Sequence, residues 1–291
     1  MITFEENIVS IHGEFGQKWL NNLNKIVLNL AKVWTLTNLK PFDNLTFNYV
    51  LSGFQNKTPI VLKVGIRDEN LRKEAQALKF FENVGAIELI DSAKDALLLR
   101  RAIPGNSLAE RFPDNEDKSI QIAADVIKKL RSVGGVYDGF FTIEDLLSDL
   151  YKEWGIPSRY IRKARRIANS LQKTTTRRLL VHGDLHHDNI VKDGDGWKII
   201  DPTGVVADPA YEIASFMFNP IDKIWKREDF VAIIQNRIEK FSKLLNIDPN
   251  RILQWTYVKS VLCWIWCSET PNNDRSVLAK LFDKIVEYDS L

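Results

Sequence analysis

The chain has 291 residues, 45% of them hydrophobic and 27% charged, which is enough apolar material for one large globular domain or two smaller ones. Forty Lys and Arg against thirty-eight Asp and Glu give a formal net charge of +2, which excludes a purely electrostatic binder of nucleic acids or acidic membranes. The two cysteines, Cys263 and Cys267, lie four apart in a helical pattern and do not indicate a disulfide scaffold.

No targeting or membrane segment is predicted. Residues 1–7 contain Glu5 and Glu6 and have neither a basic leader nor an apolar stretch, so we expect no secretory signal. The longest uncharged apolar run near the C-terminus, 260–268, is far shorter than a membrane span. We therefore expect a cytoplasmic protein that binds neither membranes nor nucleic acids.

Residues 48–101 predict strands with one helix among them. Apolar runs at 49–51, 60–64 and 96–99 alternate with turn signals. Between the second and third runs, apolar residues recur at helical spacing, with Asp68 as a predicted N-cap and Gly85 as a predicted stop. These apolar residues are Leu71, Ala75, Leu78, Phe81 and Val84.

A domain boundary is predicted at 101–105, where an X-Pro pair and a glycine favour an extended connector. We expect an N-terminal nucleotide-binding lobe over 1–101, a hinge at about 101–105 and a helical lobe over 106–291.

Beyond this connector, apolar residues three and four apart predict helices. The predicted helices span 117–133, 143–154, 159–171, 227–245, 251–267 and 275–288. In their midst, 179–181 is a short apolar run. Residues 189–191 and 197–200 are predicted to pair as a hairpin across the turn residues 193–196.

Residues suited to catalysis concentrate beside this hairpin. The segment 182–189 holds three of the four histidines and two carboxylates, in a loop between strands, where catalytic groups commonly lie. Asp184, Asn189 and Asp201 have the order and approximate spacing of a phosphoryl-transfer loop followed by a metal-binding aspartate.

Each residue type suits a step of phosphoryl transfer. Mg²⁺ neutralises the charge on a nucleotide's γ-phosphoryl group, and the Asn189 amide and Asp201 carboxylate are hard oxygen ligands for it. Asp184 would orient the acceptor hydroxyl and take its proton. Lys63 would hold the nucleotide phosphates, and Glu74 on the following helix would hold Lys63. The sequence therefore predicts an ATP- and Mg²⁺-dependent kinase.

These residues resemble the motifs of the aminoglycoside phosphotransferase family, and most of all its streptomycin 6-kinase and hydroxyurea phosphotransferase branch. The likeness covers about 45–267. It rests on the segments 48–50, 97–100 with 104–105, 182–189, 200–204 and 208–211.

The resemblance implies an α+β, two-lobed protein-kinase-like fold, with an antiparallel sheet plus one helix in the N-lobe and a larger helical C-lobe carrying the catalytic hairpin. It implies that Asp184 is the catalytic base, that Asn189 and Asp201 bind Mg²⁺, and that Lys63, paired with Glu74, contacts the ATP phosphates.

The same resemblance implies that the backbone from Arg101 to Ile103 meets the adenine. The implied reaction transfers the γ-phosphoryl group of ATP to a hydroxyl of an aminoglycoside-like small molecule, with streptomycin as the first substrate to test.

Two features depart from the protein-kinase pattern. No G-x-G-x-x-G motif precedes Lys63, because residues 45–50 contain no glycine. Pro202 follows Asp201 where a protein kinase has Phe, which favours a permanently formed metal site over an activation-loop switch.

Other interpretations stay open. In an extended 179–186 segment, His182, Asp184 and His186 would share one face and could ligate zinc, as in a metal hydrolase. His182 is alternatively explained as a loop-holding residue whose ring bonds nearby backbone. The glycine-poor loop would also suit a nucleotide-binding pseudokinase, and the acceptor could be hydroxyurea or another metabolite.

The acceptor site is the least defined, because a cationic sugar needs carboxylates around the cleft. The candidates are Glu144, Asp145, Asp208, Glu212, Glu269 and Asp274. Asp208 precedes Pro209 and predicts a helix N-cap instead, so we expect Glu212 and Glu269 to contact the substrate.

Segment 159–178 contains eight Lys or Arg and no acid. We interpret it as a solvated helix face rather than an RNA site, because Tyr160 is its only aromatic residue.

Overall fold

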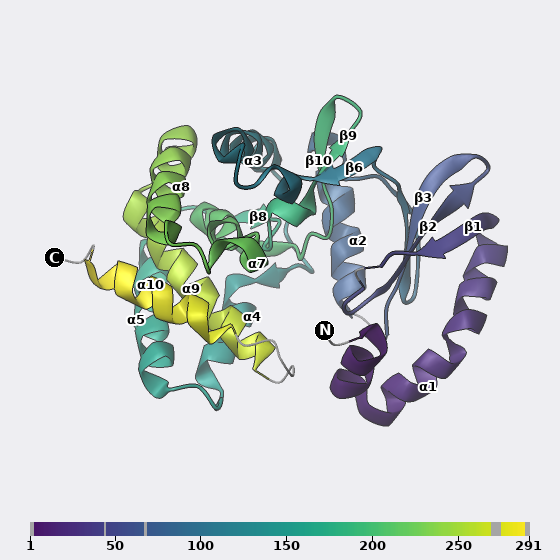
Figure 1. Cartoon of the computed structure of the whole chain (residues 1–291), viewed down its shortest axis with the longest axis horizontal. Helices are drawn as coiled ribbons and strands as arrows, with labels where there is room; N and C mark the ends of the chain where they lie inside the picture. The colour runs from purple at the N-terminus through teal and green to yellow at the C-terminus, as the bar shows by residue number, and fades with distance from the viewer. Residues whose placement is uncertain (1–2, 44, 67–68, 269–274, 289–291) are drawn as a thin grey trace.

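A five-stranded antiparallel sheet forms the N-terminal part of the computed structural model, which describes residues 3–43, 45–66, 69–268 and 275–288 (Figure 1). Its spatial order is β1-β2-β3-β5-β4. The strands are β1 (Leu36–Pro41), β2 (Tyr49–Gln55), β3 (Thr58–Val64), β4 (Leu89–Ala93) and β5 (Ala96–Arg100). This sheet confirms the strand-rich N-terminal lobe of the predicted fold.

Side-chain alternation gives this sheet two buried faces. Leu62 and Leu98 belong to a cluster with α1 (Phe4–Val33), whereas Leu97 and Leu99 pack in a second cluster with α2 (Glu69–Phe81). Neighbouring residues of a strand point to opposite faces, so Lys63, next to Leu62, faces α2. Figure 1 shows α2 between the sheet and the helical part, and α1 on the other side of the sheet.

Helix α1 was not predicted from the sequence. Thr3 and Glu6 form a capping box at its start, in which Oγ1 of Thr3 accepts from the Glu6 N–H at 3.2 Å and Oε2 of Glu6 accepts from the Thr3 N–H at 2.8 Å. Gly13 has a non-helical backbone with φ of 55° and kinks the helix. Apolar residues three and four apart, Ile8, Ile11, Phe15 and Trp19, continue across Gly13, so the helical spacing is present in the sequence and was overlooked.

The rest of the chain is mostly helical, as predicted. The remaining α-helices are α3 (Glu116–Arg131), α4 (Ile143–Leu147), α5 (Ser158–Thr174), α6 (Ala214–Met217), α7 (Ile221–Ile224), α8 (Phe230–Leu245), α9 (Pro249–Cys267) and α10 (Ser276–Tyr288). Short 3-10 helices are η1 (Glu82–Val84), η2 (Leu108–Arg111), η3 (Ser148–Tyr151), η4 (His187–Asn189) and η5 (Pro209–Ile213). The predicted helix 143–154 is thus shorter, because it passes into η3.

Two small sheets lie in this helical part. One has the order β10-β9-β6 and the other β7-β11-β8. Their strands are β6 (Pro104–Ser107), β7 (Phe141–Thr142), β8 (Leu179–Val181), β9 (Ile190–Asp193), β10 (Gly196–Ile199) and β11 (Val205–Ala207). β9 and β10 are the predicted hairpin, in register from Asp193 opposite Gly196 to Ile190 opposite Ile199.

The hairpin is bonded to the N-terminal part as well as to the helical part. The Ile87 N–H donates to the Ile199 carbonyl at 2.9 Å, and the Ile199 N–H donates to the Gly85 carbonyl at 2.8 Å. The Gly194 N–H donates to the Ile103 carbonyl at 2.7 Å. These bonds fix the catalytic hairpin against the end of α2 and the chain that follows β5.

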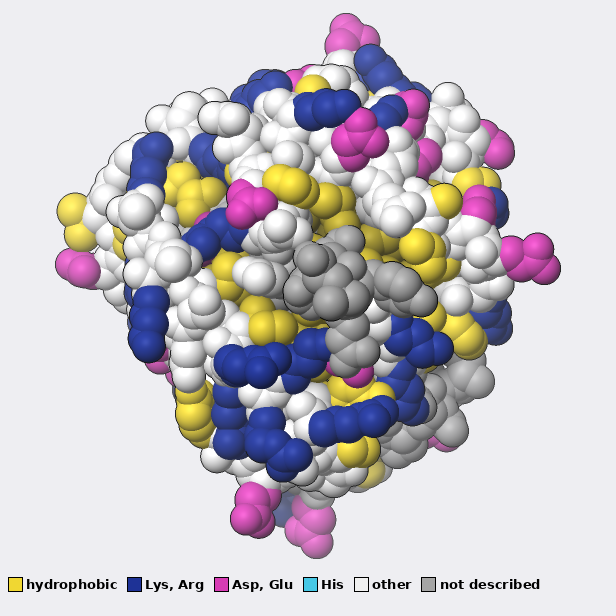
Figure 2. Space-filling model, turned by 90° about the vertical axis from the view of Figure 1, so that its left-hand side faces the viewer, with side chains coloured by type: hydrophobic (Ala, Val, Ile, Leu, Met, Phe, Trp, Pro, Cys, Tyr) yellow, Lys and Arg dark blue, Asp and Glu magenta, His cyan; other side chains and the backbone are white. Residues whose placement is uncertain are grey.

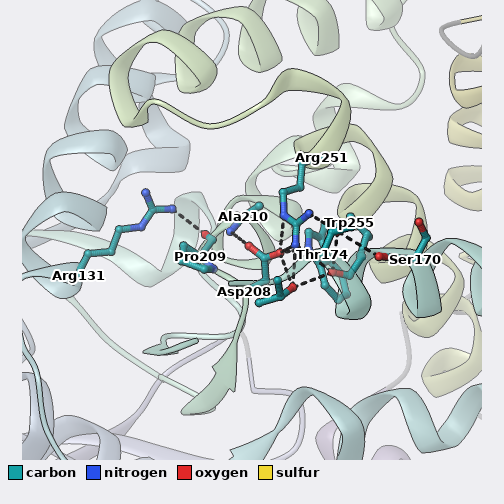
Figure 3. A network of polar contacts seen from close by, with 10 residues as sticks. Arg131, Ser170, Thr174, Asp208, Pro209, Ala210, Arg251 and Trp255 are labelled. Atoms are coloured by element: carbon teal, nitrogen blue, oxygen red, sulfur yellow. Dashed lines mark hydrogen bonds and ion pairs between the residues drawn. The ribbon is translucent and has the colours of Figure 1, made fainter. Parts of the chain in front are cut away.

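Asp208 joins η5 to α9, and the carbonyl of the next residue, Pro209, binds α3 (Figure 3). Its Oδ1 accepts from the Ala210 N–H at 2.9 Å, which is the N-cap predicted from the Asp-Pro pair. Its Oδ2 accepts from Arg251 Nε at 2.6 Å and Trp255 Nε1 at 2.9 Å, both on α9. Arg131 of α3 donates to the Pro209 carbonyl at 2.6 Å. Asp208 is 4% exposed and is a structural residue, as expected.

The basic residues of α5 lie largely on the surface. Figure 2 shows Lys and Arg side chains gathered on the lower part of the face formed by the helical end of the molecule. Lys163 Nζ lies 2.7 Å from Asp283 Oδ1, and Arg178, which follows α5, bonds Glu144 through both terminal nitrogens. No described helix is both long enough and apolar enough to cross a bilayer.

Candidate active site

The loop after β8 is held by the buried ring of His182. Its Nδ1 accepts from the Asp184 N–H at 3.3 Å, so its Nε2 carries the hydrogen and donates to the Ile200 carbonyl at 2.9 Å. Burial lowers the pKa of His182 to about 4, so the ring is neutral. This geometry supports the loop-holding interpretation. It also removes the zinc interpretation, because both ring nitrogens of His182 are already bonded.

Gly183 allows this loop to turn. Its φ is +85°, and a Cβ there would lie 2.6 Å from Cγ2 of Val205 on β11. Only glycine accepts that combination of a left-handed backbone and a close neighbour without strain. Asp184 is the residue that follows this turn.

Asp184 is anchored through one carboxylate oxygen. Ser215 Oγ donates to Oδ1 at 2.7 Å, and Lys259 Nζ lies 3.7 Å from the same oxygen. The side chain remains 44% exposed, and Oδ2 lies 3.8 Å from His186 Nε2. Burial opposes the charge, but Lys259, His186 and the Ser215 hydrogen bond lower the pKa of Asp184 to about 2. Asp184 is therefore a carboxylate at neutral pH.

Lys63 lies between two carboxylates. Its Nζ is 2.8 Å from Glu74 Oε2 on α2 and 3.2 Å from Asp201 Oδ1 at the end of the hairpin. Burial opposes the ammonium charge, but Asp201 and Glu74 outweigh it and raise the pKa of Lys63. The structure thus brings together three residues that lie up to 138 positions apart, since 201 − 63 = 138.

Asn189 and Asp201 have the donor atoms that a hard cation needs. Asn189 Nδ2 donates to the Asp184 carbonyl at 3.0 Å, which leaves its amide oxygen for a ligand. Asp201 has a left-handed φ of 57°, and its side chain is 46% exposed. An amide oxygen and a carboxylate, completed by phosphate oxygens and water, are a typical Mg²⁺ donor set, so the residues present fit this ion.

Gly204, after Asp201, lets α2 approach the segment that carries Asp201. Its φ is +73°, and a Cβ there would meet Ala77 Cβ of α2 at 3.0 Å and Phe140 at 3.2 Å. Lys73 of α2 also donates to the Gly139 carbonyl at 2.6 Å. These contacts hold α2 where Glu74 reaches Lys63.

The structure corrects the expected substrate role of Glu212. This residue is 2% exposed, and its Oε2 accepts from the His182 N–H at 2.7 Å. It therefore supports the catalytic loop from behind and does not reach a substrate. Glu269 and Asp274 lie outside the described residues.

The other predicted acceptor carboxylates are engaged elsewhere. Glu144 is paired with Arg178, and Asp145 caps α4 by accepting from the Thr142 N–H at 2.7 Å.

The expectation for Ile103 also needs correction. Its N–H donates to Asp193 Oδ1 at 3.1 Å, and its carbonyl accepts from the Gly194 N–H. The Ile103 N–H is therefore used by the hairpin turn and is not left for adenine, and its carbonyl already accepts one hydrogen bond there. The Arg101 N–H donates to the Pro59 carbonyl at 3.1 Å, so of Arg101 only the carbonyl is left to face a base.

Two residues of the site were not identified from the sequence. Ser215 stands in an ordinary helical segment and gives no signal. Lys259 does, because it is the one charged residue between Arg251 and Glu269, in a run of apolar residues. A lone charge in a buried helix needs a partner, and that partner is Asp184.

Comparison with known proteins assigns the chain to a family. The family model for aminoglycoside/hydroxyurea antibiotic resistance kinases matches residues 40–270. The chain belongs to this family. It is therefore a phosphotransferase of the aminoglycoside kinase group and uses ATP as phosphoryl donor, as predicted from the sequence.

Individual relatives agree with this assignment. The chain is 24% identical to streptomycin 6-kinase of Streptomyces glaucescens over 87% of its length and 86% of that protein's. It is 26% identical to streptomycin 3''-kinase of Klebsiella pneumoniae over 75% and 84%. A thermostable variant of aminoglycoside phosphotransferase APH(4)-Ia, solved with AMP-PNP and hygromycin B, has the same fold, with a TM-score of 0.70, 15% identity and coverage of 92% and 99%. The predicted protein-kinase-like fold is thereby confirmed.

Proposed function

We propose that this kinase phosphorylates a hydroxyl group of streptomycin, with Asp184 as the base and Mg·ATP as the donor. The observation that carries the chemistry is the meeting of Lys63, Glu74 and Asp201 within 3.2 Å, beside a loop that presents Asp184 and Asn189. The family and the streptomycin kinases among its relatives support the choice of acceptor.

In this proposal each side chain has a separate task. Lys63 binds phosphate oxygens of ATP, and Glu74 keeps its ammonium group in place. Asn189 and Asp201 would hold Mg²⁺, which neutralises charge on the phosphates when bound. Asp184 accepts a hydrogen bond from the acceptor hydroxyl and finally takes its proton. Because the pKa of Asp184 is about 2, its main contribution is to orient the hydroxyl, and the proton moves late.

A cytoplasmic location fits this function, because ATP is available there and the reducing conditions keep Cys263 and Cys267 as thiols.

The test is ADP release from Mg·ATP in the presence of a panel of acceptors: streptomycin, other aminoglycosides, hydroxyurea, amino sugars and choline. Asp201→Ala is the blank, because it removes one proposed Mg²⁺ ligand. Streptomycin-stimulated ADP release that the blank lacks, together with a phosphate ester detected by mass spectrometry, would support the proposal.

Other outcomes have definite meanings. Stimulation of ADP release by a different acceptor would support the kinase activity but show that streptomycin is not the substrate. Tight ATP binding without turnover on any acceptor would favour the pseudokinase.

A further inference from the structure

Lys259 contacts the catalytic loop at two points. Its Nζ donates to the Gly183 carbonyl at 3.0 Å and lies 3.7 Å from Asp184 Oδ1. The two contacts are on consecutive residues, one on the backbone and one on the carboxylate. A single ammonium group therefore fixes both the position of the peptide before Asp184 and the rotation of its side chain.

The surroundings of Lys259 keep this ammonium group in place. The side chain is 5% exposed, and Nζ lies 5.2 Å from the centroid of the Tyr211 ring and 5.0 Å from that of Trp266. Both rings are within the range of a cation–π contact. A lysine enclosed by two aromatic rings has few other positions, so its charge is directed at Asp184.

The two carboxylate oxygens of Asp184 have different contacts. Ser215 and Lys259 both engage Oδ1, from α6 and α9 respectively. Oδ2 lies on the His186 side of a carboxylate that is 44% exposed. Ser215 already donates a hydrogen bond to Oδ1, whereas Oδ2 accepts none from the residues that the structure describes, so Oδ2 is left for the reacting hydroxyl.

We infer that Lys259 is a positioning residue for phosphoryl transfer: with Ser215 it immobilises Oδ1 of Asp184 and thereby presents Oδ2 to the acceptor hydroxyl. This inference rests on the proposed function, because it assumes that Asp184 is the base of a kinase. It adds a residue from α9, which lies outside the catalytic loop and the hairpin.

The first test measures whether Lys259 and Asp184 interact, without any need for turnover. Urea unfolding of the wild type, Lys259→Met, Asp184→Asn and the double variant forms a double-mutant cycle. The unfolding equilibrium constant of the double variant should differ by about threefold or more from the value that two independent substitutions would give, as expected for residues in contact. Additive effects of the two substitutions would overturn the inference.

The second test measures whether the contact serves the reaction. For Lys259→Met we expect kcat to fall roughly 10- to 100-fold with the best acceptor, or for ATP hydrolysis by water if no acceptor works, because the base loses its alignment. The KM for ATP should stay within about twofold, since Lys259 does not contact the nucleotide side of the site. Lys259→Arg, which keeps the charge, should have a higher kcat than Lys259→Met.

Lys163→Met is the matched control. Lys163 makes the same two kinds of contact, with Asp283 Oδ1 at 2.7 Å and the Tyr257 ring at 5.1 Å, rather than with Asp184. It should lose stability but keep kcat within about twofold.

The outcomes distinguish a failure of the role given to Lys259 from a failure of the proposed kinase activity. An active wild type whose kcat is unchanged in Lys259→Met, or is lowered equally in Lys163→Met, would overturn the role of Lys259 and leave the kinase intact. A folded wild type that binds ATP but releases no ADP with any acceptor or with water would instead overturn the proposed function.

Discussion

Nζ of Lys63 lies 3.2 Å from Oδ1 of Asp201, so a residue of β3 and a residue at the end of the hairpin are in contact. Glu74 completes the group from α2 at 2.8 Å. The left-handed backbone of Asp201, with φ of 57°, turns its carboxylate toward Lys63. The cation proposed for the phosphates and the proposed metal ligand are thus held side by side by one ion-paired group.

Glu74→Gln should weaken this assembly. The amide keeps the shape of the side chain but removes one of the two negative charges beside the buried Lys63. We expect the affinity for ATP to fall roughly tenfold and the free energy of unfolding to fall by about 1–3 kcal/mol, since a hydrogen bond between charged groups is lost. Isothermal titration with ATP and urea unfolding measure the two effects.

Glu69→Gln on the same helix is the control, because Glu69 and Arg72 form an ion pair in which both side chains are 65% exposed. Such a pair contributes little to stability. Equal effects of the two substitutions would contradict the role given to Glu74.

Asp184→Asn tests the base directly. The amide can still accept from Ser215 through its oxygen, but it cannot take a proton. We expect kcat to fall by about 10² to 10⁴, with ATP affinity unchanged within about twofold. Steady-state ADP release and ATP titration on the same preparation give both numbers, and a variant that kept full turnover would show that another group is the base.

The sequence was informative wherever chemistry requires particular residue types at short spacing. The hairpin and the set Asp184, Asn189 and Asp201 lie within one short segment, and the turn residues between β9 and β10 predict their arrangement. Lys63 and Glu74 could be predicted because a strand and the next helix carry them. These are local patterns, and the fold preserves them.

The sequence was uninformative wherever contacts join distant segments. Ser215 and Lys259 reach Asp184 from 31 and 75 positions away, since 215 − 184 = 31 and 259 − 184 = 75, and only the packing of α6 and α9 against the loop brings them there. Glu212 was misplaced for the same reason: its carboxylate suggested a contact with a cationic substrate, whereas the structure buries it against the His182 N–H. Ile103 bonds the hairpin turn because β6 pairs with β9, which no local pattern indicates.

Asp208→Ala should destabilise the protein strongly. It removes the carboxylate that pairs with the guanidinium group of Arg251, leaves the indole N–H of Trp255 without its acceptor and removes the N-cap of η5 (Figure 3). Loss of one member of a buried ion pair commonly costs about 3–5 kcal/mol, and we expect a decrease of that size in the free energy of unfolding. Asp248→Ala removes an N-cap as well, but one whose hydrogen bond to the Asn250 N–H is exposed, and should cost only about 1 kcal/mol. Urea unfolding compares the two variants. If Asp208→Ala lowers the free energy of unfolding no more than Asp248→Ala does, the contribution of Asp208 to stability is that of an N-cap alone.

Glu212 should make the stability depend on pH. Burial raises the pKa of Glu212 from 4.5 to about 7, although the His182 N–H and Arg131 favour the charged form. Below pH 4.5 the carboxyl group is protonated in both the folded and the unfolded chain. Between pH 4.5 and 7 the unfolded chain loses the proton while the folded chain keeps it, so this residue's contribution to stability falls as the pH rises.

Glu212→Gln removes this dependence, since the amide oxygen can still accept from the His182 N–H but carries no charge. Relative to the wild type, the variant should gain up to about 3 kcal/mol in the free energy of unfolding between pH 4.5 and 8, because each unit of pKa shift corresponds to about 1.4 kcal/mol. Glu144→Gln is the control of opposite sign. Burial opposes the charge of Glu144, but the hydrogen bonds from Arg178 and Gln172 lower its pKa, so its stabilising contribution is present above pH 4.5, and that variant should be less stable than the wild type by a nearly constant amount between pH 5 and 8. Urea unfolding of the three proteins at pH 5, 6, 7 and 8 checks both signs, and a pH-independent difference between wild type and Glu212→Gln would mean that Glu212 is ionised throughout, with Arg131 as its counterion.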